Sequence, residues 1–196
     1  MQKGIFCLEG LWNDNLKQKS SVQPILNLLE INGGIPFIFH DVATVEELEF
    51  YVSKWRQARY KGYPILYFAF HGENESLLIA NHKYHLGQLA TVLKGACTNS
   101  IFLFASCKTL RDGHGTIAEF METTEALAIF GYRNRVSWMY SAALELLILT
   151  ELQNVDFSTR GMNSFEKKIN SFAAAFQKID YTLVTRHNGK KHRKGH

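Results

Sequence analysis

Three unbroken apolar runs constrain the fold of this chain more than any other feature. They occupy residues 65–70, 101–105 and 126–130. An apolar run of this length, without alternating polar residues, is typical of a strand that is buried on both faces. Segments in which apolar residues recur every three or four positions separate these runs, and they predict amphipathic helices. Strands that alternate with helices in this way predict an α/β fold with a mainly parallel sheet.

The rest of the chain continues this alternation. Further strands are predicted at 5–8, 36–42 and 181–185. One helix is predicted between Ser21 and Gly33, and Thr44 with Glu47 has the capping-box spacing that starts another. The remaining helices are predicted at 86–93, 116–123, 136–152 and 165–179. Because no stretch rich in Pro, Gly or Ser divides the chain, we expect one domain over residues 1–186, with about six strands and helices on both faces of the sheet.

The basic charge is concentrated at one end of the chain. The net charge of +4 comes from 22 Lys and Arg against 18 Asp and Glu, and hydrophobic residues make up 46% of the chain. Residues 186–196 contain five basic residues and no acidic one, so the remainder is close to neutral. This distribution argues against a broad basic surface for nucleic acid. We predict a basic, disordered tail at 187–196, with a tether to nucleic acid or to an acidic partner as the alternative.

Compartment and cofactor signals are absent from the sequence. The N-terminus has no apolar stretch typical of a secretory signal, and no apolar run approaches the roughly 20 residues of a membrane span. The three cysteines have no CxxC spacing, and His82, His85 and His114 lack the spacing of a metal site. We therefore expect a cytoplasmic protein with no membrane association, no metal and no organic cofactor.

Two reactive side chains follow two of the apolar runs. His71 follows the run at 65–70, and Cys107 follows the run at 101–105. Since substrates bind at the carboxyl ends of parallel strands, neighbouring strands would place His71 beside Cys107 at that edge. The imidazole could then take the thiol proton, and the thiolate could attack a carbonyl carbon. Gly72 would let a substrate approach the backbone closely. A packed cysteine and a solvated histidine are the structural alternative.

Motifs in a fixed order surround this pair. They are ILYFAFHG at 65–72, ESLLIA at 75–80, LGQLA at 86–90, IFLFASCKT at 101–109, GHG at 113–115 and ALAIFGYRNRVSW at 126–138. This order resembles the CHAT domain, a family within the caspase-like (clan CD) cysteine peptidases, over about residues 60–150. The resemblance implies a caspase-like three-layer sandwich with a short hairpin after His71-Gly72.

The resemblance also implies roles for individual residues. Cys107 corresponds to the nucleophile and His71 to the general acid/base, while the backbone N–H groups of Gly72 and Cys107 correspond to oxyanion donors. True caspases have Gln-Ala-Cys-x-Gly where this chain has Ala-Ser-Cys-Lys-Thr, so a preference for aspartate is not transferred. Ser137 stands where many CHAT domains have Asp.

Loops after the predicted strands contain candidates for the wall of a substrate groove. These are Asp14, Glu73, Asp112, Arg133, Arg135 and Trp138. The acidic members would suit a basic residue at the cleavage site, and the arginines an acidic one. Solvated loop charges, and packing of Trp138 against the sheet, are the alternatives.

Together these features predict a caspase-like cysteine endopeptidase that cleaves a protein substrate through Cys107 and His71. The resemblance further implies a role in bacterial defence or regulated cell death, under the control of a protein regulator in trans. A catalytically idle interaction module is the main alternative. A flavodoxin- or receiver-like binding domain is a third, although EGLWND at 9–14 matches a phosphate loop or acidic cluster only weakly.

Overall fold

A six-stranded sheet forms the centre of the computed structural model, which describes residues 2–18, 20–111, 115–173 and 179–186. In spatial order the strands are β2 (Phe37–Val42), β1 (Ile5–Gly10), β3 (Ile65–Ala69), β7 (Ile101–Phe104), β8 (Ala128–Tyr132) and β9 (Tyr181–Thr185). The first five strands are parallel, and only β9 runs antiparallel, against β8. The predicted mainly parallel sheet of about six strands is confirmed.

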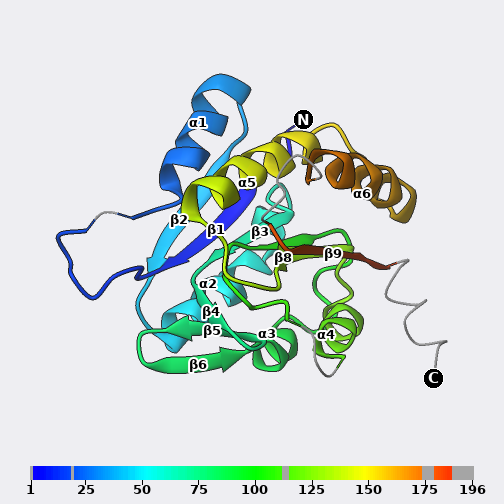
Figure 1. Cartoon of the computed structure of the whole chain (residues 1–196). Coiled ribbons are helices and arrows are strands. Elements are labelled where there is room, and N and C mark those ends of the chain that lie inside the picture. The colour runs from blue at the N-terminus through cyan, green and yellow to red at the C-terminus, as the bar shows by residue number, and fades with distance from the viewer. Residues whose placement is uncertain (1, 19, 112–114, 174–178, 187–196) are drawn as a thin grey trace.

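Helices cover both faces of the sheet (Figure 1). One layer contains α1 (Gln23–Gly33), α5 (Trp138–Leu152) and α6 (Thr159–Ala173), and the other contains α2 (Val45–Trp55), α3 (Leu86–Val92) and α4 (Thr116–Thr124). Alternate residues of β3 belong to the two cores: Tyr67 lies in the same buried cluster as Leu144 of α5, whereas Phe68 lies in the cluster on the other face, with Leu48 and Phe120. The three-layer α/β arrangement is therefore confirmed.

Two predicted helix starts have different outcomes. At α2, Glu47 N donates to Thr44 Oγ1 and Thr44 N donates to Glu47 Oε2, both at 3.2 Å, so the predicted capping box is confirmed. At α1, Val22 is the N-cap and has no capping side chain. The Ser21 hydroxyl donates to Glu9 at the end of β1, and its oxygen accepts from Gln23 N at 3.0 Å. Ser21 therefore contacts the first residue of the helix, as predicted, and also ties the helix start to β1.

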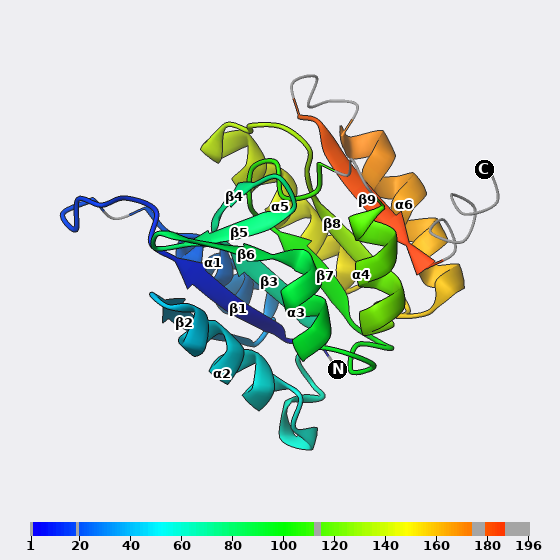
Figure 2. The same cartoon turned by 90° about the horizontal axis from the view of Figure 1, so that it is seen from below.

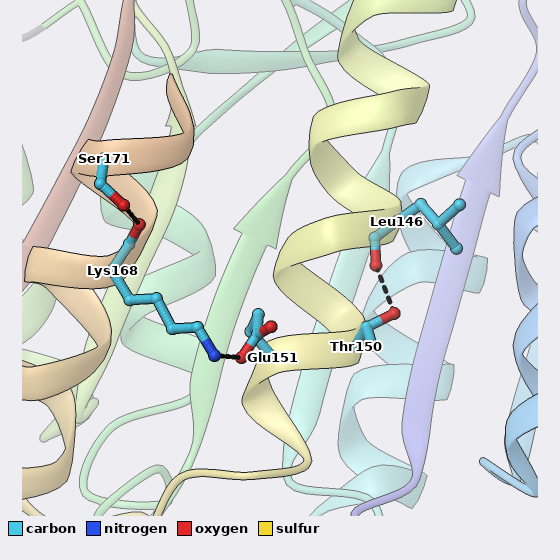
Figure 3. A network of polar contacts seen from close by, with 5 residues as sticks. All are labelled: Leu146, Thr150, Glu151, Lys168 and Ser171. Carbon is cyan, nitrogen blue, oxygen red and sulfur yellow. Dashed lines mark hydrogen bonds and ion pairs between the residues drawn. The ribbon is translucent and has the colours of Figure 1, made fainter. Parts of the chain in front are cut away.

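Predicted boundaries moved most in the C-terminal half. The helix predicted at 165–179 occupies Thr159–Ala173, and the strand predicted at 126–130 occupies Ala128–Tyr132. Leu127 N donates to Ser100 O at 2.9 Å, one residue before the ladder between β7 and β8 begins at Ile101 and Ala128. Helix α6 packs beside α5, where Lys168 forms an ion pair with Glu151 (Figure 3). The apolar pattern indicated that these elements exist but not where each begins.

A separate three-stranded antiparallel sheet follows β3 (Figure 2). It contains β4 (His71–Glu73), β5 (Ser76–Ile79) and β6 (His82–His85), in the order β4-β5-β6. Asn74 and Glu75 connect β4 to β5 with φ values of 43° and 62°, the left-handed conformation that tight hairpin turns require. Tyr84 of β6 is buried against the α2 layer and donates from its hydroxyl to Glu49 at 2.8 Å. The hairpin thus fixes the direction in which the chain leaves β3.

A short 3₁₀ helix, η1 (Ala58–Tyr60), precedes β3. Within the described ranges, none of the helices combines the length and the apolar character needed to cross a bilayer. The predicted basic tail at 187–196, the candidate Asp112 and the histidine His114 lie outside the described residues.

Candidate active site

The carboxyl ends of three adjacent strands bring the candidate side chains together. Strand β3 pairs directly with β1 on one side and with β7 on the other. Trp12 follows β1, His71 follows β3 and Cys107 follows β7, so all three belong to one edge of the sheet. The prediction that His71 and Cys107 come from neighbouring strands is confirmed.

A cavity of about 190 Å³ lies at this edge. Its lining comes from the strand ends, from α1 and from the start of α5: Trp12, Val22, Ile25, Phe70, His71, Ala105, Cys107, Val136, Trp138, Ser141, Ala142 and Glu145. Most of these side chains are apolar. The titratable members are His71, Cys107 and Glu145.

Cys107 lies in a tight turn directly after β7. The next residue, Lys108, has φ of 59°, a left-handed conformation that a non-glycine residue adopts at a cost. Backbone bonds fix both sides of the turn, from Ala105 N to Phe68 O at 2.9 Å and from Leu110 N to Tyr132 O at 3.2 Å. The turn is thus held between β3 and β8, and the thiol is positioned by rigid strands rather than by a free loop.

The three cysteines differ in accessibility. Cys7 and Cys97 are buried, whereas Cys107 is partly exposed and lines the cavity. Burial raises the pKa of the Cys7 thiol well above its ordinary value and raises that of Cys97 to about 12. A thiol reacts through its thiolate, so the two buried cysteines are unsuited to nucleophilic chemistry, and Cys107 is the accessible candidate.

Gly72 packs directly against the turn that carries Cys107. A Cβ atom at this position would lie 2.5 Å from the Cys107 carbonyl oxygen and 2.8 Å from Ser106 Cβ, and closer still to Thr109 Oγ1. The sequence analysis predicted that Gly72 lets a substrate approach the backbone. In the structure, the missing side chain is needed for β4 to reach the Cys107 turn, so Gly72 sets the spacing between the two candidate residues.

The His71 ring is oriented by the residue that follows β1. His71 Nε2 lies 2.7 Å from the carbonyl oxygen of Trp12, and the two rings meet edge to face at 5.2 Å. Because a carbonyl oxygen only accepts, Nε2 carries the proton and Nδ1 of the neutral ring is left as the acceptor. No hydrogen bond joins His71 to Cys107 in the part of the chain that the structure describes. Both groups nevertheless line the same cavity.

Glu9 anchors the loop that carries Trp12. This buried carboxylate accepts hydrogen bonds from Trp12 Nε1 at 2.6 Å, from Ser21 Oγ at 2.5 Å and from Val22 N at 2.8 Å. Burial raises the pKa of Glu9, and the three hydrogen bonds act in the opposite direction. Sequence reasoning considered residues 9–14 only as a weak phosphate-loop or acidic-cluster match and missed this role. The sequence does contain a signal for this role, because Glu9 is an acidic residue at the end of an apolar strand.

Glu145 is a second buried acidic residue that sequence reasoning missed as a site residue. It is 1% exposed and accepts from Tyr67 OH at 2.5 Å and from Tyr132 OH at 2.8 Å. Burial raises the pKa of Glu145 to about 7, although both tyrosine hydrogen bonds lower it. The available signal was one acidic residue within the apolar run at 142–149.

Of the five predicted groove residues that the structure describes, only Trp138 lines the cavity. Trp138 packs edge to face on Trp12 at 4.7 Å and remains 39% exposed at the edge of the cavity. Glu73 pairs with Lys83 at 2.8 Å inside the hairpin. Arg133 donates to Thr182 Oγ1 of β9 at 2.7 Å. These two charged side chains therefore have partners outside the cavity.

The other two described candidates lie on the surface. Asp14 and Arg135 are exposed, and neither belongs to the cavity lining. Among the described residues, no group of three or more His, Cys, Asp and Glu side chains is arranged to hold a metal ion. His85 Nδ1 lies 3.1 Å from Ser76 Oγ, a contact within the hairpin.

Comparisons with known proteins give one family. A search of curated proteins finds no match to this chain. Residues 2–184 match a family described as "Family of unknown function (DUF6642)". Since this match spans far more than half of the 196 residues, the chain belongs to the DUF6642 family.

Proposed function

We propose that this chain is a caspase-like cysteine endopeptidase that acts through Cys107 and His71. The observation that carries the proposal is the shared cavity: a partly exposed cysteine and an oriented imidazole line the same space at the carboxyl edge of β3 and β7. A nucleophile beside a base, with the base held by a third group, is the arrangement that thiol acyl transfer needs. The third group here is the Trp12 carbonyl.

The reaction follows from these two side chains. Nδ1 of His71 takes the proton of the Cys107 thiol, and the sulfur attacks a peptide carbonyl carbon, forming a C–S bond and an oxyanion. Collapse of this intermediate breaks the C–N bond, and the imidazolium gives its proton to the departing amine. Water then attacks the thioester, His71 accepts a proton from it, and the sulfur leaves with a proton as the carboxylic acid is released.

The oxyanion needs donors that are fixed before the reaction. The backbone N–H groups of Gly72 and Cys107 are the proposed donors, because β4 and the Cys107 turn are packed against each other at Gly72. In this proposal the substrate is a protein, a partner protein controls the activity in trans, and the setting is a cytoplasmic defence or cell-death pathway.

A labelling and cleavage experiment tests the proposal. The native chain is treated with a peptidyl acyloxymethyl ketone library and with a fluorogenic peptide library, and the modified residue is located by mass spectrometry. We expect labelling at Cys107 and cleavage that Cys107→Ala abolishes. The buried Cys97 serves as an internal control for nonspecific alkylation. Absence of Cys107-dependent labelling and cleavage would contradict the peptidase and favour the idle interaction module.

A further inference from the structure

Among the described residues, the lining of the cavity beside Cys107 includes one acidic residue and no lysine or arginine. Glu145 belongs to the lining, and the lining residues otherwise are apolar apart from His71, Cys107, Ser141 and the two tryptophans' N–H groups. A buried carboxylate is stable only when it is paired or hydrogen-bonded. Glu145 is hydrogen-bonded but has no opposite charge beside it in the described lining, so a cation that enters the cavity would meet an acidic group.

The neighbours of Glu145 confirm that it has no cationic partner in the described structure. Each carboxylate oxygen accepts one hydrogen bond, from Tyr67 and from Tyr132, and both donors are neutral hydroxyls. The other titratable group that faces it is Cys7 of β1, and this buried thiol is neutral. Burial is the main cause of the raised pKa of Tyr132, and the nearby Cys107 thiol contributes to it in the same direction. The hydroxyls hold the carboxyl in place without neutralising it.

The walls of the cavity suit a long side chain with an apolar stem. Trp12 and Trp138 pack against each other at 4.7 Å, and Val22, Ile25 and Val136 complete the apolar lining. Lysine and arginine bury their methylene stems against such surfaces, and tryptophan rings attract cations. The cavity volume of about 190 Å³ is many times the roughly 10–15 Å³ that one water molecule needs, so the cavity has room for a long side chain.

We propose that this cavity binds a lysine or arginine side chain of the substrate, with the charged head at Glu145 and the stem against Trp12 and Trp138. Because Cys107 and His71 line the same cavity, the bound residue is the one whose carbonyl the sulfur attacks. That last assignment rests on the proposed function, whereas the cation site itself does not. Of the charged loop residues selected from the sequence, the four that the structure describes lie outside the cavity lining, and Glu73 is already paired with Lys83.

The first experiment tests the cation site without catalysis. Binding of n-butylammonium and n-butylguanidinium to the full chain is measured by NMR at alkaline pH, with n-butanol as the neutral probe. We expect saturable binding of both cations, at least about tenfold stronger than that of n-butanol, and loss of this difference in Glu145→Gln. Glu151→Gln, on the same helix but paired with Lys168 outside the cavity, is the matched control.

A second measurement does not depend on a variant that folds. The carboxyl carbon of Glu145 is followed by NMR during a pH titration of the wild type, with and without n-butylammonium. Cation binding favours the ionised carboxyl, so the ligand is expected to lower the midpoint of the titration. An unchanged midpoint at saturating cation, or equal affinity for n-butanol, would overturn the proposal.

The third experiment separates this inference from the proposed function. Peptides that differ only in the residue before the scissile bond carry lysine, arginine, norleucine or citrulline. We expect kcat/KM to be at least about tenfold higher for the two basic residues, and Glu145→Gln to bring the ratio close to one. Cleavage without this preference overturns the cation site and leaves the peptidase. Cation binding without any cleavage contradicts the peptidase and leaves the cation site.

Discussion

Replacement of Glu145 by Gln is predicted to stabilise the fold at alkaline pH. Burial raises the pKa of this carboxyl from the ordinary value of 4.5 to about 7. The folded state therefore binds more protons than the unfolded state between these values, and the free energy of unfolding of the wild type falls as the pH rises through that window. Below about pH 4.5 both states are protonated, and the penalty is absent.

The magnitude follows from the displacement of the pKa. A shift from 4.5 to about 7 corresponds to about 3 kcal/mol, and the group is buried, so solvent does not reduce the effect. Glutamine keeps the shape and can bond to Tyr67 and Tyr132 without a charge. The variant is therefore expected to be about 3 kcal/mol more stable than the wild type above pH 7, with a difference near zero at about pH 4.5.

Urea unfolding measures this difference in the free energy of unfolding. It is followed by tryptophan fluorescence and repeated from about pH 5 to about pH 9. The exposed Glu119→Gln on α4 is the control for loss of one acidic residue, and its profile is expected to run parallel to that of the wild type. A difference between Glu145→Gln and the wild type that stays flat with pH, or that favours the wild type at alkaline pH, would refute the reasoning.

Three further predictions concern the candidate site. Iodoacetamide should alkylate Cys107 of the native chain before either buried cysteine, and peptide mapping of a time course that found equal rates would contradict its assigned accessibility. Gly72→Ala should destabilise by about 1–3 kcal/mol in urea unfolding and lower Cys107 labelling, because the added methyl overlaps the Cys107 turn. Gly87→Ala, where nothing lies within 4 Å, should be neutral or stabilising, and equal effects of the two would refute the packing argument. Glu9→Ala should cost about 2 kcal/mol or more, because it leaves three donors without their acceptor, and should broaden the Trp12 indole N–H signal in NMR. An unchanged signal would exclude the anchoring role.

The sheet and its two helix layers were predictable because the signals are local and redundant. Residues 65–70, 101–105 and 126–130 are apolar without interruption, which is typical of strands covered on both faces, and strands β3, β7 and β8 begin within these runs. The position of His71 beside the Cys107 strand followed from the rule that consecutive parallel strands lie close together, and β3 does pair with β7.

The electrostatics of the site were not predictable in the same way. Glu9 and Glu145 each appear in the sequence as one acidic residue in an apolar context, and their partners lie far away along the chain. Tyr67 and Tyr132 converge on Glu145 only because β3, β8 and α5 pack together. Conversely, the sequence suggests that Glu73 and Arg133 are solvated loop charges. In the structure, Glu73 pairs with Lys83 and Arg133 donates to Thr182. Periodicity reports which face is buried and carries no information on which polar groups pair.

The central claim is that Cys107 and His71 form one reactive centre, and peptide cleavage tests it most directly. Wild type, Cys107→Ala and His71→Ala are compared on a peptide library that includes lysine and arginine before the scissile bond. We predict that the wild type hydrolyses peptides and that both substitutions abolish this hydrolysis. The unfolding midpoints of the two variants should match that of the wild type. Hydrolysis that persists in Cys107→Ala, or no hydrolysis and no Cys107 labelling by the wild type, would contradict the claim.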